Sequence, residues 1–141
     1  MNPRYFHVSS NCFDVGDILR PRGAHYEEDW KHSDFYWALE RHRPPDKRAQ
    51  KDAVFLFCDF ESADMMGGEW IYEVGPQSPA SRHDMNWTGE ICSLVADGYQ
   101  IDSGEIRRAA TSYWNGEPSP NERLWEYLTS GAEILSVASC K

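Results

Sequence analysis

His7 and Glu126 are polar residues in apolar surroundings, where they could exchange protons or hydrogen-bond a ligand. His7 stands in the aromatic and β-branched run 5–9, which predicts a strand, and a histidine in such a strand is more often a core residue than a catalyst. Glu126 stands between Trp125 and Tyr127. A carboxylate there is either solvated or held in a pocket, and period-two alternation, which places it opposite the two rings, favours exposure to water.

A histidine and a carboxylate are also adjacent at His83-Asp84, within the polar segment 77–89 that is predicted to be irregular. They could form an acid–base pair for hydrolysis, although loop residues of these types are often neighbours. The chain has no sequence motif for phosphate or dinucleotide binding, a serine nucleophile or a zinc protease, and no helix-turn-helix or RNA-recognition signature.

The four cysteines are widely spaced, at Cys12, Cys58, Cys92 and Cys140, so no pair has the short spacing of a zinc site. The N-terminal residues lack the apolar region of a signal peptide, which predicts a cytoplasmic, reducing compartment. We therefore expect no metal site and free, mostly buried thiols, with a cysteine nucleophile as an alternative for a hydrolase.

Charge and composition narrow the classes of partner. The chain has 14 basic and 23 acidic residues, a net charge of -9, which argues against general DNA binding. Residues 1–52 carry nine of each sign, so the excess of acid lies in 53–141, where a basic protein partner could bind. No apolar run is long enough to cross a membrane. The 19 aromatic residues can fill a core or stack on a flat ligand.

Periodicity and turn residues predict a single α+β domain, residues 1–141, of short strands with two or three helices. Residues 24–32 are expected to form a loop. Strands are expected at 4–9, 53–58, 70–74, 91–95, 124–128 and 132–137. Candidate helices lie at 35–42 (capped by Ser33), 46–51, 60–66, and after a capping box from Asp102 to Glu105. The buried face of this last helix would hold Ile106, Ala109, Ala110, Tyr113 and Trp114.

The order of these segments resembles the small ADP-ribosyltransferases, particularly the rifampin ADP-ribosyltransferase type. In that family an aromatic-His-Gly-Thr strand precedes a Gly-Asp-x-Leu turn, as 5–9 precedes 15–19 here. Segments 54–57 and 70–76 resemble its next two strands, and 126–137 is similar to the strand pair that carries a catalytic glutamate in many members. The resemblance implies an ADP-ribosyltransferase-like split β-fold that holds NAD in a cleft.

Roles for individual residues follow from the same resemblance. His7 would hydrogen-bond the adenosine ribose and the nicotinamide side of NAD, helped by the backbone of Val8 and by Ser9. Phe55 would occupy a tyrosine position and stack on nicotinamide. Glu126 would bind the 2′-hydroxyl of the nicotinamide ribose and stabilise the positive charge that develops as nicotinamide leaves. ADP-ribose would pass to a protein, nucleic-acid or small-molecule acceptor.

Further residues add to this set or compete within it. In rifampin-type members the acidic residue comes earlier, so Asp84 competes with Glu126 for the catalytic role. The NAD phosphates are expected to meet the basic residues of the first half, which are Arg20, Arg22 and the cluster 41–51.

Two departures from the family pattern leave the activity open. Val8 stands where the family has glycine and would crowd the approach of a ligand to the backbone. Phe55 lacks the tyrosine hydroxyl, which Tyr72 on the neighbouring strand could supply. The chain is therefore either an NAD-dependent ADP-ribosyltransferase or a catalytically inactive fold of this kind that acts as an acidic interaction or inhibitor module.

Overall fold

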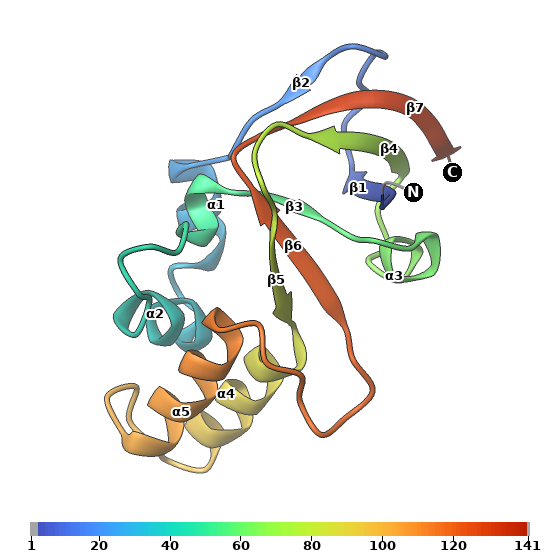
Figure 1. The fold of residues 1–141 in the computed structure, drawn as a ribbon. Coiled ribbons are helices and arrows are strands. Elements are labelled where there is room, and N and C mark those ends of the chain that lie inside the picture. The colour runs from blue at the N-terminus through green and yellow to red at the C-terminus, as the bar shows by residue number, and fades with distance from the viewer. Residues whose placement is uncertain (1–2, 141) are drawn as a thin grey trace.

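The computed structural model describes residues 3–140, which form two antiparallel sheets and five α-helices (Figure 1). The elements are, in chain order, β1 (Tyr5–Ser9), β2 (Ile18–Leu19), α1 (Ala24–Trp30), α2 (Asp34–Arg41), the 3-10 helix η1 (Gln50–Asp52), β3 (Val54–Leu56), α3 (Phe60–Asp64), β4 (Trp70–Pro76), β5 (Ser81–Asp84), α4 (Asn86–Ala96), α5 (Gly104–Trp114), β6 (Trp125–Thr129) and β7 (Ala132–Cys140). The predicted α+β class is confirmed, but two or three helices were too few.

The first sheet has the strand order β1-β4-β7-β2 and the second the order β3-β6-β5. Strands β1 and β3 belong to different sheets and meet at one bridge, where the backbones of Phe6 and Phe57 exchange hydrogen bonds of 2.7 and 2.8 Å. At the next position the side chain of His7, not its backbone, reaches the Phe55 carbonyl oxygen, at 2.9 Å. The two sheets are therefore joined at a corner and open away from it.

Three apolar clusters hold the layers together. One cluster fills the space between the sheets and consists of Leu19, Val54, Leu56, Tyr72, Val74, Ala132 and Ile134. A second lies between the three-stranded sheet and the helices α2, α4 and α5, which group beside β5 and β6 in Figure 1. A small third cluster lies under α3. The three-stranded sheet is thus covered on both faces.

Helix α5 confirms the predicted buried face, since all five residues assigned to it are buried. Its start differs by one residue from the prediction. Ser103 is the N-cap, with its Oγ accepting from the Ile106 amide at 3.3 Å, while Asp102 instead pairs with Arg41 at 2.8 Å. Ser33 does precede α2, but its side chain makes no capping hydrogen bond.

Four local expectations were wrong. Segment 77–89, expected to be irregular, contains strand β5 and the start of helix α4. Residues 24–32, expected as a loop, contain helix α1. Of the expected helix 46–51 only Gln50 and Lys51 are helical, as part of η1. Residues 91–95, expected as a strand, lie inside α4. Their apolar residues join with Trp87 to repeat at i, i+4, i+7 and i+8 against the helical core, and this helical spacing extends beyond the short run considered alone.

Candidate functional site

A cleft lies between β1 and β3 where the two sheets open. It has a larger cavity of about 670 Å³, bordered also by α1 and by residues 66–68 after α3, and a smaller cavity of about 230 Å³. We call the two cavities together the β1–β3 cleft, because they share part of their lining. The shared residues are His7, Ser9, Asn11, Arg22, Tyr26 and Phe55.

The structure brings six of the predicted ligand-binding residues to this cleft. His7, Val8, Ser9 and Phe55 line the larger cavity, Arg20 lines the smaller one, and Arg22 lines both. They come from three separate parts of the chain, and the bridge between Phe6 and Phe57 places two of these parts, β1 and the segment of β3, next to one another.

The imidazole of His7 has a defined hydrogen-bonding state. Its Nδ1 lies 2.9 Å from the carbonyl oxygen of Phe55, and because a carbonyl only accepts, Nδ1 carries the proton. Burial lowers the pKa of His7 below its ordinary value of 6.5, against the opposing effect of this hydrogen bond. At neutral pH the ring is therefore uncharged, and its Nε2 is a hydrogen-bond acceptor with no partner among the described residues.

Val8 is accommodated without filling the cleft. Its side chain packs on the cluster under α3, and Gly68 leaves room for it, since a Cβ at Gly68 would lie 2.2 Å from Val8 Cγ1. Val8 thus stands against a glycine on the facing segment, which leaves space for its β-branched side chain.

Helix α1 supplies an aromatic wall that the sequence analysis missed. The ring of Tyr26 stacks on Phe55 with centroids 5.4 Å apart and planes at 24°, and Trp30, one turn later, lines the larger cavity with 38% of its surface exposed. The i, i+4 spacing of two aromatic residues was the available signal. It was masked by the polar residues of α1, which has no fully buried position.

The charged side chains of the cleft differ in whether they are already paired with one another. Arg20 is exposed and has no hydrogen bond or ion pair with any described residue, so its guanidinium is free for an anionic ligand. Arg22 pairs with Asp29 at 2.5 Å. Asp29 is the one carboxylate among the described residues that line the cleft.

The basic cluster 41–51 does not line the cleft, contrary to the expectation for NAD phosphates. Three of its members are paired with carboxylates, as Arg41–Asp102, Arg43–Glu40 and Lys51–Glu27. Part of the cluster borders a separate hollow of about 440 Å³.

Glu126 is also outside the cleft lining and, contrary to the alternation argument, is only 4% exposed. It lies on the central strand of a sheet that is covered on both faces, so the face opposite Trp125 and Tyr127 is buried under α5. Its Oε1 accepts from the Tyr113 hydroxyl at 3.4 Å. Burial raises the pKa of Glu126 to about 8 from an ordinary 4.5, against this hydrogen bond, so the carboxyl is mostly protonated at neutral pH.

Asp84, the competing catalytic candidate, is fully buried and holds the backbone in place. Its carboxylate accepts from the amides of Asn86 at 3.0 Å, Ser119 at 2.9 Å and Leu124 at 3.3 Å. The side chain thus joins the start of α4 to the loop before β6, and it does not line the cleft.

His83 and Asp84 do not form an acid–base pair, because successive side chains of a strand point to opposite faces. His83 stacks on Tyr113 with centroids 4.7 Å apart, and its Nδ1 lies 2.7 Å from the Tyr113 carbonyl oxygen. Burial lowers the pKa of His83 to about 4, so the ring is neutral and structural.

Tyr72 is buried between the sheets and does not line the cleft, so it cannot offer its hydroxyl to a ligand there. The hydroxyl accepts from the Phe13 amide at 2.7 Å and donates to the Asn11 carbonyl at 3.2 Å. Since Asn11 and Phe13 both line the cleft, Tyr72 supports one wall from behind.

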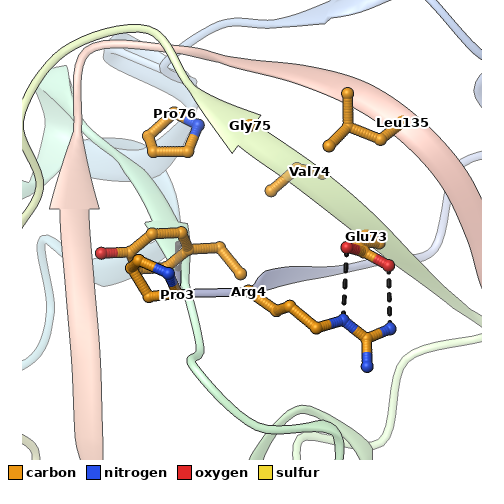
Figure 2. Close-up of a pocket in the computed structure, with 8 residues that line it drawn as sticks. Pro3, Arg4, Glu73, Val74, Gly75, Pro76 and Leu135 are labelled. Atoms are coloured by element: carbon orange, nitrogen blue, oxygen red, sulfur yellow. Dashed lines mark hydrogen bonds and ion pairs between the residues drawn. The ribbon is translucent and has the colours of Figure 1, made fainter. Parts of the chain in front are cut away.

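A different hollow, of about 450 Å³, lies against β1, β4 and β7. Figure 2 shows Arg4 turned onto Glu73, with hydrogen bonds of 3.3 Å from Nε and 2.8 Å from Nη2. This pair leaves neither charge free, and the rest of the lining is largely apolar. The hollow contains none of the residues predicted to have a function.

Among the described residues, neither the cysteines nor any group of metal-binding side chains forms a second candidate site. No disulfide joins any of the four cysteines, all of which lie in the described range, but Cys12, Cys92 and Cys140 are exposed and Cys58 is half-buried, so the expected burial was wrong. Among residues 3–140, no three His, Cys, Asp or Glu side chains are grouped so as to hold a metal ion. Within the same range, no helix has the length and apolar character needed to cross a membrane.

The chain is an α+β protein with a cleft between its two sheets. Its sequence matches no protein-family model and no curated protein. Function is therefore inferred from the residues of the cleft, together with the resemblance in the order of the segments.

Proposed function

We propose that this protein binds NAD in the β1–β3 cleft and transfers the ADP-ribose part to an acceptor. The observation that carries the proposal is the convergence of His7, Ser9, Phe55 and Arg20 on one cleft. The resemblance to small ADP-ribosyltransferases implies NAD contacts for His7, Ser9 and Phe55, and Arg20 is a cation of the first half that could meet the phosphates.

The chemistry of the cleft suits a dinucleotide. The larger cavity, of about 670 Å³, is within the size range of small-molecule sites, and the smaller cavity of about 230 Å³ adjoins it. The rings of Tyr26, Trp30 and Phe55 offer flat faces for stacking a nicotinamide or an adenine. His7 Nε2 can accept from a ribose hydroxyl, and Arg20 can pair with the pyrophosphate.

The reaction would be a displacement at the anomeric carbon of the nicotinamide ribose. The bond from this carbon to nicotinamide breaks with its electron pair going to the leaving nitrogen, while the acceptor forms a new bond to the same carbon and loses a proton. Positive charge develops on the ribose in between, and a nearby carboxylate lowers its energy. Asp29 is the carboxylate placed in the cleft for this role, with Arg22 holding it in position.

The alternative is a catalytically inactive fold that acts as an acidic interaction or inhibitor module. Two observations favour it: Asp29 is already paired with Arg22, and Glu126 is buried away from the cleft. The acidic residues of 53–141 would then bind a basic partner, with an affinity that falls as salt increases.

Calorimetric titration with NAD tests the binding step. We expect saturable binding by the wild type and about tenfold weaker binding by His7→Ala, since one hydrogen bond of the ligand is lost. Arg20→Ala should also weaken binding, whereas Glu28→Gln, which removes a carboxylate outside the cleft, should not. Absence of saturable binding by the wild type, in protein shown to be folded, refutes the proposal.

Turnover of NAD separates the two candidate functions. We expect the wild type to release nicotinamide and Asp29→Asn to do so about 100-fold more slowly, as when one charge-stabilising group is removed. Nicotinamide is measured by chromatography, with Glu28→Gln as the matched carboxyl-to-amide control. NAD binding without any nicotinamide release would instead support the inactive alternative.

A further inference from the structure

Four side chains form a continuous series of hydrogen bonds from the cleft into the interior. The Tyr26 hydroxyl lies 3.3 Å from Gln50 Oε1, Gln50 Nε2 lies 3.0 Å from the Tyr113 oxygen, and the Tyr113 hydroxyl lies 3.4 Å from Glu126 Oε1. The four residues come from α1, η1, α5 and β6. Tyr26 is the one member that lines the cleft.

Every donor in this series points inward. The Gln50 amide nitrogen only donates, so the Tyr113 oxygen must accept and its own proton is directed to Glu126. The Gln50 amide oxygen only accepts, so Tyr26 must give its proton to Gln50. The Tyr26 hydroxyl therefore keeps its proton on the Gln50 side and presents its oxygen to the cleft as a hydrogen-bond acceptor.

The arrangement is buried except at its cleft end. Gln50 is 3% exposed, Glu126 4% and Tyr113 0%. Buried polar groups are unfavourable unless each is satisfied, and bonds in such a series strengthen one another in a medium of low dielectric constant. The state of Glu126 is thus coupled to the oxygen of Tyr26 through two intermediate side chains.

We propose that Glu126 is a positioning residue which, through Tyr113 and Gln50, holds the Tyr26 hydroxyl as a hydrogen-bond acceptor in the β1–β3 cleft. His7 Nε2 is a second acceptor on the same wall. The cleft therefore selects ligands that present two hydrogen-bond donors, such as ribose hydroxyls or a carboxamide. The choice of NAD as the probe below depends on the proposed function, whereas the coupling between Glu126 and Tyr26 does not.

The coupling has a predictable direction with pH. Ionised Glu126 is a stronger acceptor, which makes each oxygen along the series more negative and the Tyr26 oxygen a better acceptor for the ligand. Ligand binding should therefore tighten as Glu126 ionises, about pH 8, and binding should in turn promote ionisation.

Other titratable or charged groups surround the series and could contribute to the pH dependence of ligand binding. His83 on β5 lies directly opposite Glu126 in the register of β5 and β6. Tyr36, Glu40 and Arg22 interact electrostatically with Tyr26. All of these remain in a Glu126→Gln variant, so the difference between this variant and the wild type isolates Glu126. The glutamine still offers an oxygen to the Tyr113 hydroxyl.

The first arm of the test needs no ligand. The carboxyl carbon of Glu126 is followed by NMR through a pH titration, with its signal assigned by its absence from Glu126→Gln. We expect Tyr26→Phe to raise the proton affinity of Glu126 about two- to threefold. The Tyr26 hydroxyl then no longer donates to Gln50, so the hydrogen bonds that stabilise ionised Glu126 are weaker. Tyr36→Phe is the matched control, since it removes a neighbouring hydroxyl outside the series. Equal proton affinity in wild type and Tyr26→Phe overturns the proposal.

The second arm measures the NAD dissociation constant between pH 7 and pH 9. We expect about two- to fivefold tighter binding at pH 9 in the wild type, and loss of this dependence in both Glu126→Gln and Tyr26→Phe. The same dependence in wild type and Glu126→Gln overturns the positioning role. Should the wild type bind no NAD, the proposed function fails, and the titration of Glu126 still decides whether the series is coupled.

Discussion

Replacing Glu126 with glutamine is expected to make the protein progressively more stable relative to the wild type as pH rises from 5 to 8. The pKa of Glu126 is raised by burial from 4.5 to about 8, so the folded state binds its proton more tightly than the unfolded state does. Between these two values the unfolded chain loses the proton first, and wild-type stability falls with pH.

The size of this effect follows from the pKa difference. Each pH unit between the two pKa values is equivalent to about 1.4 kcal/mol, so the difference in unfolding free energy between variant and wild type should change by about 3 to 4 kcal/mol from pH 5 to pH 8. Glutamine carries no titrating proton and does not share this loss. Urea denaturation of both proteins at pH 5, 6, 7 and 8 measures it.

Taking the difference in unfolding free energy between Glu126→Gln and the wild type cancels the contributions of the other groups that titrate between pH 5 and pH 8. His7 and His83 have lowered pKa values, so each contributes stability that is lost as pH falls below the unfolded value of 6.5. Both are present in the variant and in the wild type. A difference in unfolding free energy that stays constant with pH would show that Glu126 titrates normally and is accessible to water in the folded state.

Asp84→Ala is expected to destabilise the fold by about 3 to 5 kcal/mol, because it leaves three backbone amides in a buried region without their acceptor. Both the start of α4 and the loop before β6 would lose their common attachment. Urea denaturation of both proteins at pH 7 measures the loss.

Two further variants define the role of Asp84. Asp84→Asn keeps one acceptor oxygen and should lose about half as much stability, while Asp97→Ala, at the exposed end of α4, should change it by less than about 0.5 kcal/mol. If Asp84→Ala abolished nicotinamide release and left the unfolding free energy unchanged, Asp84 would be catalytic and not structural.

The two predictions distinguish a structural from a catalytic role for Glu126 and Asp84, the two carboxylates that were expected to compete for the catalytic role. Both Glu126 and Asp84 are buried in the structure and neither lines the cleft. Their main expected effects are on stability and, for Glu126, on the pH dependence of ligand binding. Asp29, in the cleft itself, is the residue whose loss should reduce turnover most directly.

The sequence by itself determined the elements whose residues repeat over a sufficient length. The strands predicted at 4–9, 70–74, 124–128 and 132–137 correspond to β1, β4, β6 and β7, and α5 buries the face that its spacing indicates. In each of these, local propensity and apolar period agree with the fold. Helix α1 was missed because it buries no residue completely, so no apolar stripe marks it in the sequence.

Only the tertiary structure decided the surroundings of each polar side chain. Alternation along 125–129 places Glu126 opposite two aromatic rings, but whether that face meets water depends on a helix that lies earlier in the chain. Likewise, the cleft exists because β1 and β3 meet at one bridge and then separate. Burial and proximity are non-local, so the sequence named part of the site, such as His7, Phe55 and Arg20. The packing of distant segments added Tyr26, Trp30 and Asp29 and decided the charge states and partners of these residues.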